Sequence, residues 1–211
     1  FKQSYRNASM RDDSLGMANT LSLMSEILIN WRLFGYANDF VSKAVELSRN
    51  VRGSNPKVSA NILAQKALVM QRFGYADSAM MYLGEAEKYA KDLPYNSGRS
   101  SIDLVRGDLL AKNASTHKKG MDMIRNVVDK GTSGLRTKAF FILAQEYLQH
   151  GEIARGEAAM DSMISSISIN TSPVLRNTMY EYVLDYYVTT DNRPKMLWIA
   201  RELNKKNLSV V

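Results

Sequence analysis

The chain contains no cysteine, four prolines, two histidines and no long hydrophobic run. Without cysteine no disulfide framework can form, and this absence suits an oxidising compartment as well as a reducing one. The longest apolar stretches, such as Ala139 to Ala144, are far shorter than the roughly 20 residues that a membrane-spanning helix needs. The sequence therefore predicts no membrane span in this stretch of chain and leaves its compartment open.

Residues that carry chemistry are equally sparse. His117 and His150 both fall in expected turn regions, outside metal-binding spacings such as H-E-x-x-H, so we expect them to be solvated. The sequence has no Walker-type G-x-x-x-x-G-K-[ST] motif, no cysteine nucleophile and no serine that stands out as activated. We therefore expect no catalytic residue, no metal site and no cofactor.

A tetrapeptide recurs intact: Phe34-Gly35-Tyr36-Ala37 returns as Phe73-Gly74-Tyr75-Ala76, 39 residues later. Each copy follows one segment with apolar residues at helical spacing and precedes another, which is typical of a helix, a tight turn and a second helix. With turns placed at Gly35, Gly74, Ser115, Gly151 and Asp191, the intervals are 39, 41, 36 and 40 residues. The sequence therefore predicts about five helical hairpins with insertions between them.

Positions 5, 9 and 12 residues after each turn line one side of a helix, and all of them are apolar or glycine. They are Phe40, Ala44 and Leu47; Ala79, Leu83 and Ala86; Gly120, Ile124 and Val127; Gly156, Met160 and Met163; Met196, Ala200 and Leu203. We predict an all-α fold, a right-handed superhelix of about five antiparallel helical hairpins over residues 14–206. Residues 207–211 are expected to be a C-terminal tail. Residues 1–13 are expected to be a tail or the cut end of a preceding helix, in a fragment of a longer protein.

The pattern resembles the tetratricopeptide repeat (TPR), a helical hairpin of about 34 residues. In that family the fourth, eighth and eleventh residues of the first helix pack the hairpin. The fourth is matched by Met24, Leu63, Leu104, Phe140 and Tyr180, and the eleventh by Trp31, Met70, Ala111, Tyr147 and Tyr187. The small eighth residue is matched by Ala67 and Ala144 but not by Leu28, Asp108 or Leu184. Because the units are also longer than the family's, the resemblance is to degenerate TPR-like hairpins forming a solenoid.

Arrays of this kind resemble the sensory or regulatory region of bacterial signalling proteins, which continues into a transmembrane helix and a histidine kinase or DNA-binding domain. The resemblance implies a non-enzymatic domain that binds a protein, peptide or other ligand, as the sensory or scaffolding part of a larger bacterial signal-transduction or transcription-regulating protein. The location it implies is the bacterial cytoplasm, the periplasm, or the extracytoplasmic part of a membrane-anchored protein.

In the resembled family, certain positions of each first helix line the concave face and hold the partner. Carried over residue by residue, the resemblance implies a groove with the polar members Arg32, Asn61, Gln71, Arg72, Lys112, Asn113, Lys138, Gln145, Gln149 and Asp185. Arg32, Arg72 and Lys112 fall near corresponding places in three successive hairpins, and this basic ladder could hold a carboxylate or an acidic peptide. The competing interpretation is that these cations at helix ends are simply solvated.

The net charge of +7, from 28 basic and 21 acidic residues, favours acidic partners and makes RNA the alternative ligand. RNA readers of one base per repeat need strict register, so the unequal intervals and scattered basic residues disfavour nucleic acid. An enzyme with no recognisable motif is the remaining alternative. Tyr180 and Tyr187 are predicted to lie in the core, whereas Tyr182 and Tyr186 form a pair on another side of the same helix.

Overall fold

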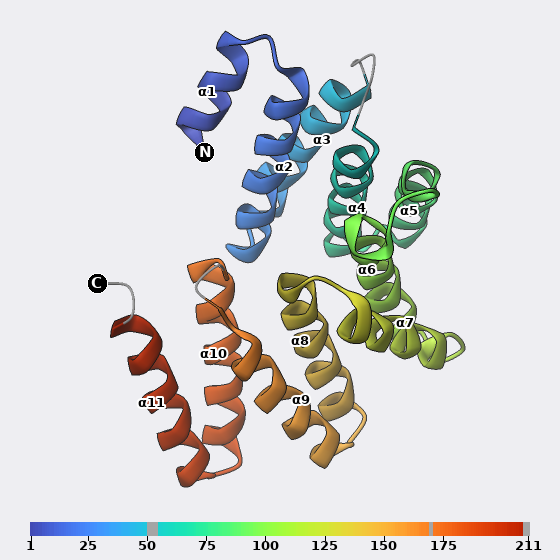
Figure 1. Cartoon of the computed structure of the whole chain (residues 1–211). Helices are drawn as coiled ribbons and strands as arrows, with labels where there is room; N and C mark the ends of the chain where they lie inside the picture. The colour runs from blue at the N-terminus through green and yellow to red at the C-terminus, as the bar shows by residue number, and fades with distance from the viewer. Residues whose placement is uncertain (50–54, 169–170, 209–211) are drawn as a thin grey trace. The chain divides into compact units, whose positions relative to one another are not determined.

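The computed structural model describes residues 1–49, 55–168 and 171–208, and in these ranges it is helical with no strand (Figure 1). Its helices are α1 (Lys2–Met10), α2 (Ser14–Asn30), α3 (Phe34–Arg49), α4 (Pro56–Arg72), α5 (Ala76–Ala90), a 3₁₀ turn η1 (Tyr95–Ser97), α6 (Arg99–Ala111), α7 (His117–Lys130), α8 (Ser133–Gln149), α9 (Ile153–Ser166), α10 (Pro173–Thr189) and α11 (Arg193–Leu208). The predicted all-α fold is confirmed. Residues 207 and 208 belong to α11, while 209–211 of the expected tail lie outside the described residues. No described helix is long and apolar enough to cross a membrane.

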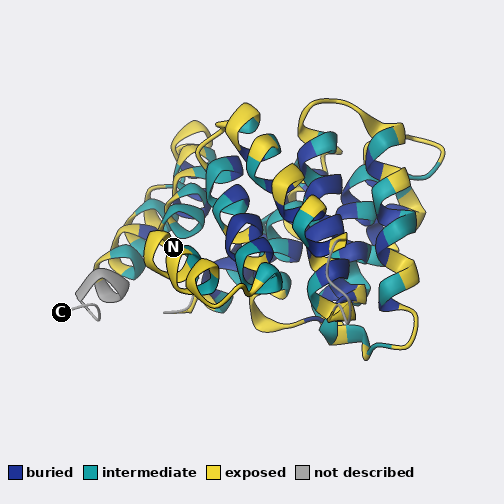
Figure 2. Cartoon of the chain, turned by 90° about the horizontal axis from the view of Figure 1, so that it is seen from above, coloured by how far each residue is buried: buried dark blue, intermediate teal, exposed yellow. Residues whose placement is uncertain are grey.

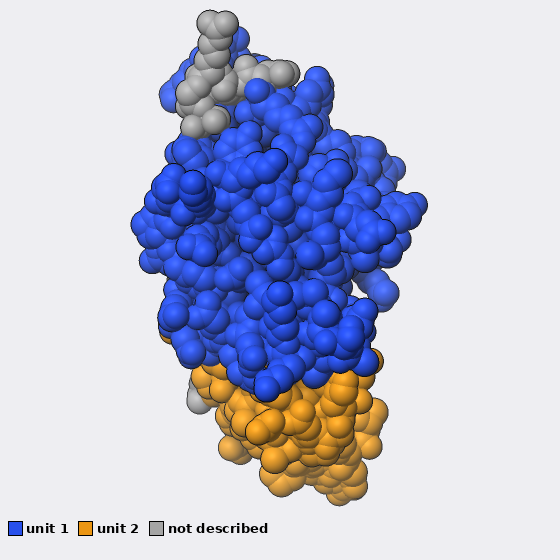
Figure 3. Space-filling model, turned by 90° about the vertical axis from the view of Figure 1, so that its right-hand side faces the viewer, with its two compact units in different colours: residues 1–135 blue, residues 136–211 orange. Residues whose placement is uncertain are grey.

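The chain divides into two compact units, residues 1–135 and 136–211 (Figure 3). In the first unit α2 packs on α3, α4 on α5 and α6 on α7, which makes three successive hairpins. Neighbouring hairpins are joined through contacts of α3 with α4 and of α5 with α6, and the first helices α2, α4 and α6 also touch in sequence. This is a helical repeat arrangement, in which each hairpin buries its apolar sides against its neighbours.

Alanine is the commonest residue in the main core of the first unit. Its main cluster is rich in alanine and includes Ala44, Ala60, Ala67, Ala79 and Ala86, all with no exposed surface. Figure 2 shows buried residues along the sides of the helices that face one another. Alanine permits helix axes to approach closely, and larger side chains such as Ile62, Leu83 and Ile102 fill the remaining space in the same cluster. The predicted buried positions of α5 and α7 are confirmed. They are Ala79, Leu83 and Ala86 in α5, and Gly120, Ile124 and Val127 in α7.

The turn between α2 and α3 differs from the prediction. Its residue with left-handed backbone is Arg32, with φ of 60°, whereas Gly35 lies inside α3. The Arg32 N–H donates to the carbonyl of Ile29, and the next N–H, that of Leu33, donates to the carbonyl of Leu28. The same pair of bonds, three and five residues back, closes α4 at Gly74, α8 at Gly151 and α10 at Asp191. Arg32 is therefore the structural counterpart of Gly74.

This three-residue offset corrects the expected buried face of α3. Counted from Arg32, positions 5, 9 and 12 are Ala37, Val41 and Ala44, and none of them has exposed surface. The predicted Phe40 and Leu47 are only half-buried. The two identical tetrapeptides thus have different roles: one spans the turn before α5, and the other forms the first turn of α3.

Trp31, predicted to pack within its hairpin, is 57% exposed because α2 ends at Asn30 and the chain leaves the helix at Trp31. Tyr147, which the same family position predicted to be buried, is buried. It lies four residues before the turn residue Gly151, so its counterpart before Arg32 is Leu28 rather than Trp31.

Two glycines bring α6 and α7 into backbone contact. A Cβ added to Gly120 would lie 2.4 Å from the Ala111 nitrogen and 2.6 Å from the Gly107 oxygen. A Cβ added to Gly107 would lie 3.0 Å from the Gly120 oxygen. Only residues without a Cβ permit this crossing.

The second unit contains α8 from Arg136 onwards, followed by α9, α10 and α11. The Thr137 hydroxyl donates to the Ser166 carbonyl at 3.2 Å, which links α8 to the end of α9. In α10 Met179, Tyr180, Val183 and Tyr187 are buried, which confirms the core prediction for the two tyrosines, and Tyr182 and Tyr186 are half-buried.

The predicted buried positions of the second unit hold in one helix and fail in the other. In α9, Gly156, Met160 and Met163 are buried as predicted. In α11 the predicted Ala200 is exposed, and its neighbour Ile199 is buried instead. The side of α11 that meets α10 is therefore centred one residue earlier than predicted.

Candidate binding surfaces

Four of the predicted groove residues lie along α4 or at the end of α6 in the first unit. Asn61 accepts a hydrogen bond from the Ser101 hydroxyl at 2.9 Å, and Gln71 donates to the Asp108 carboxylate at 2.8 Å. Asp108 also pairs with the Lys112 ammonium at 3.1 Å. Arg72, the last residue of α4, is exposed. We call the five residues Asn61, Gln71, Arg72, Asp108 and Lys112 the polar strip.

The strip is less basic than predicted. Asp108 is buried, with 4% of its surface exposed, and its carboxylate is shared between Lys112 and Gln71. Asn113, in the turn after α6, accepts hydrogen bonds from the backbone N–H and the hydroxyl of Ser115. The positive charge of Lys112 is thus largely used within the protein, and the Asn113 side chain holds its own turn.

The proposed ladder of Arg32, Arg72 and Lys112 has one member out of register. Arg32 occupies the left-handed turn position that Gly74 occupies in the next hairpin, two residues beyond Arg72. Arg32 and Arg72 therefore lie two positions apart when the two turns are matched, one more than in the sequence frame, and binding by these residues stays a prediction.

The remaining predicted groove residues belong to the second unit. Lys138, Gln145 and Gln149 lie on α8, and Asp185 lies on α10. Gln145, Gln149 and Asp185 are exposed and Lys138 is half-buried. Their 7- and 4-residue spacing places the three α8 residues on one side of that helix. Whether they bind a partner stays a prediction.

Exposed aromatic residues gather where the first two hairpins turn, and this surface was not predicted. The ends of α2 and α4 and the starts of α3 and α5 carry Trp31, Arg32, Tyr36, Arg72, Phe73 and Tyr75. We call these six residues the turn surface. The Phe34 ring meets the Phe73 ring edge-on at 6.4 Å between centroids, and Phe73 stacks on Tyr75 at 6.1 Å. These ring contacts bring the two turns side by side.

The repeated tetrapeptide was the sequence feature that could have revealed the turn surface. Its aromatic residues were assigned to a turn motif, and Trp31 was assigned to the core. Their exposure depends on where α2 ends, which the apolar periodicity alone does not determine.

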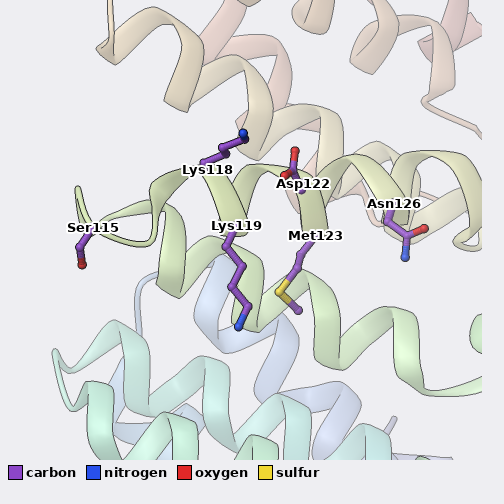
Figure 4. Close-up of a pocket in the computed structure, with 6 residues that line it drawn as sticks. All are labelled: Ser115, Lys118, Lys119, Asp122, Met123 and Asn126. Carbon is purple, nitrogen blue, oxygen red and sulfur yellow. The ribbon is translucent and has the colours of Figure 1, made fainter.

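An open hollow of about 530 Å³ runs along α7 (Figure 4). It is lined by Ser115, Lys118, Lys119, Asp122, Met123 and Asn126. Figure 4 shows Lys119 and Met123 extending to one side of α7 and Lys118 and Asp122 to the other. Asp122 pairs with Arg125 one turn along. Its lining comes from α7 and from Ser115 just before that helix, and its lysines are exposed, so the hollow has the features of a solvated helix face rather than of an enclosed ligand site.

Lys66 is a buried cation in the first unit. Its ammonium donates to the Asn38 side chain at 2.6 Å and to the Ser42 hydroxyl at 2.9 Å, and it lies 5.7 Å from the centre of the Tyr82 ring. Burial lowers the pKa of Lys66, and the negative charge of Asp39 partly opposes this. The contacts link α3, α4 and α5, which is a structural role.

A second charged cluster joins α5, η1 and α6. The guanidinium of Arg106 pairs with Glu87, and this hydrogen bond lowers the pKa of the Glu87 carboxyl. Burial raises the pKa of Asp103, although Tyr95, Arg106 and Arg99 favour its charged form. Burial, together with the Asp103 charge, also raises the pKa of Tyr95. These groups tie consecutive elements together and do not form a pair of opposed acid and base.

No protein-family model matches the sequence, and no curated protein matches it. Among solved structures, the chain is similar to the crystal structure of BtubC (BKLC) from P. vanneervenii, with a TM-score of 0.57. The identity is 12%, over 99% of this chain and 87% of that chain. At this identity the similarity concerns the fold alone, an all-helical, repeat-like architecture.

Proposed function

We propose that this chain is a non-enzymatic, TPR-like helical-repeat domain that binds a protein or peptide partner. The α4/α5 hairpin supports the TPR-like description best. Its fourth and eighth positions, Leu63 and Ala67, are buried, as are Ala79, Leu83 and Ala86 in the second helix. With Arg32 as the turn residue, the eighth position of the first hairpin becomes Ser25, a small and fully buried residue.

The observation that carries the proposal is the layer formed by α2, α4 and α6. These first helices contact one another in order, and the polar strip lies across two of them. The Oδ1 atom of Asn61 is engaged by Ser101, while its exposed amide N–H groups bond to no residue in the described part of the chain. The Asn61 amide and the Arg72 guanidinium lie 11 residues, or about 16 Å, apart along α4, and donors spaced in this way suit successive carbonyl and carboxylate groups of an extended peptide.

We also propose that the domain is the sensory or scaffolding part of a larger bacterial signalling or transcription-regulating protein. This rests on the family resemblance alone. Reading the gene beyond the codon for Val211 tests it: a membrane span followed by a kinase or a DNA-binding domain is the expected result. A gene without either would remove this part of the proposal and leave partner binding intact.

The binding function is tested by selecting ligands from a displayed random-peptide library with the whole chain as bait. We expect peptides whose affinity falls by about tenfold or more in Asn61→Arg, which places a bulky cation in the polar strip. Met81→Arg is the matched control, since Met81 is 60% exposed on α5, a second helix. A library that yields no specific peptide, or peptides equally weakened by both variants, would contradict the proposed function.

RNA is the competing outcome of the same experiment. Oligonucleotide binding that falls steeply with salt, and that Asn61→Arg strengthens, would indicate a phosphate-binding surface instead.

A further inference from the structure

The turn surface has the composition of an interaction site. Trp31, Tyr36 and Tyr75 are 57%, 64% and 60% exposed, and Phe73 is 40% exposed. Single exposed hydrophobic residues are common, but here four large aromatic side chains and two arginines come from two adjacent turns. Tryptophan, tyrosine and arginine are the residue types that dominate binding energy at protein interfaces.

The turn surface lies over a packed hydrophobic cluster. Beneath it a separate core cluster joins three helices, with Ile29 from α2, Ala37 and Val41 from α3, and Val69 from α4. Phe34 packs against this cluster and also meets Phe73 edge-on. Backbone hydrogen bonds close both turns, at Arg32 and at Gly74. Phe73 and Tyr75, which these ring contacts hold in place, lose little freedom on binding, and this favours affinity.

The charges of the turn surface indicate its partner. Arg32 and Arg72 are exposed, and neither forms an ion pair or side-chain hydrogen bond with any residue that the structure describes. Asp39 and Asp77, a few residues beyond each turn, are exposed too, so the surroundings are not uniformly positive. Two free guanidinium groups among aromatic rings match a ligand that presents one or two carboxylates beside an apolar side chain.

We infer that the turn surface docks a short acidic segment of a partner protein, with an apolar side chain placed against the aromatic rings and carboxylates paired to Arg32 and Arg72. This site goes beyond the proposed function, because it lies at the tips of the hairpins and uses aromatic anchors, whereas the polar strip lies along α4 and α6. A protein segment fits better than RNA. A nucleic acid strand presents a phosphate at every nucleotide and would meet Asp39 and Asp77 as well as the two arginines.

Trp31 provides the reporter for the test. The chain has two tryptophans, and Trp198→Phe leaves Trp31 as the single indole. In this background, peptides selected from a displayed random library are titrated against the whole chain while Trp31 emission is followed. We expect the selected peptides to be enriched in Asp or Glu next to Leu, Phe or Trp, and their binding to shift the Trp31 emission.

Substitutions then locate the site. Arg72→Glu and Tyr75→Ala are each expected to weaken these peptides by about tenfold or more, while Arg72→Lys keeps part of the affinity. The matched control is Lys57→Glu, with the same change of charge at the opposite end of α4, about 22 Å away. Circular dichroism establishes that each variant keeps its helix content.

The outcomes separate the two surfaces. Arg72 belongs to both surfaces, so Tyr75→Ala is the variant that distinguishes them. Peptides that lose affinity in Asn61→Arg but keep it in Tyr75→Ala would overturn the turn-surface proposal and leave the proposed function standing. Selected peptides without acidic enrichment, or equal losses in Arg72→Glu and Lys57→Glu, would overturn the acidic docking site. No binding peptide at all would overturn both, as would binding of RNA alone.

Discussion

Replacing Gly120 by alanine tests the close crossing of α6 and α7. The added Cβ would lie 2.4 Å from the Ala111 nitrogen, and ordinary contact begins near 3.4 Å, so the helices would have to separate by about 1 Å. Overpacking of this kind costs about 1–3 kcal/mol, and here the clashing atoms are backbone, so no rotamer change relieves it. The gain of about 1 kcal/mol from replacing a helical glycine offsets part of the cost. Because the clash is with backbone, we place the cost at the upper end of that range and expect a net loss of about 2 kcal/mol.

Two other glycines calibrate this prediction. Gly84 lies inside α5 with no atom within 4 Å of an added Cβ, so Gly84→Ala should stabilise by about 0.5–1 kcal/mol. Gly107→Ala should fall between, because its closest contact, at 2.8 Å, is a side-chain carbon of Ile124 that can move. Urea unfolding followed by circular dichroism gives the order of stability, Gly84→Ala, wild type, Gly107→Ala and Gly120→Ala. If Gly120→Ala were as stable as Gly84→Ala, the crossing would not be as close as the structure describes.

Three further predictions concern the turns and the buried polar groups. Arg32→Gly should raise the unfolding free energy by about 0.5–1 kcal/mol and Gly74→Ala should lower it by a similar amount, because both positions have left-handed backbone. Urea unfolding measures both changes, and changes of the opposite sign would contradict the equivalence of the two turns. Tyr187→Phe should be neutral or stabilising by up to about 1 kcal/mol, since the hydroxyl is buried without a partner among the described residues; a clear loss in thermal unfolding would reveal a hidden partner. Because burial lowers the pKa of Lys66, burying the charged ammonium destabilises the folded state. This destabilisation is full at a pH where Lys66 is protonated in both the folded and the unfolded state, and it disappears as the pH rises towards the ordinary value of 10.5. The stability of wild type relative to Lys66→Met should therefore rise with pH in that window, and a flat difference in unfolding free energy between the two proteins would refute the assignment.

The repeat frame was predictable where the turn residue was glycine. Counting from Gly74 and Gly151, the apolar spacing placed Ala79, Leu83, Met160 and Met163 in the core, because a helix repeats its faces every 3.6 residues. The first hairpin was misplaced because Arg32 takes the left-handed conformation that sequence rules reserve for glycine. Backbone hydrogen bonds and helix packing override that local preference.

Less of the candidate site could be predicted. The resemblance brought Asn61, Gln71, Arg72 and Lys112 together, and the structure describes them along α4 and α6. It could not indicate that Asp108 would neutralise Lys112, since that depends on which side chains meet across two helices. The turn surface was missed because an aromatic residue at helical spacing predicts burial, whereas Trp31 lies one residue beyond the helix end.

The offset between the two identical tetrapeptides also bears on how such an array can grow. A recombination event that joined Phe34 to Gly74 would keep the tetrapeptide intact, yet Ala76, Met80 and Leu83 would then stand 5, 9 and 12 residues after Arg32. The native α5 buries Ala79, Leu83 and Ala86, so the transplanted helix would be turned by about 60° and would drive Met80, which is 39% exposed, into the seam. Recombination within the shared tetrapeptide would therefore produce a hairpin whose second helix buries the wrong side, whereas an exchange that aligned Arg32 with Gly74 would preserve the packing.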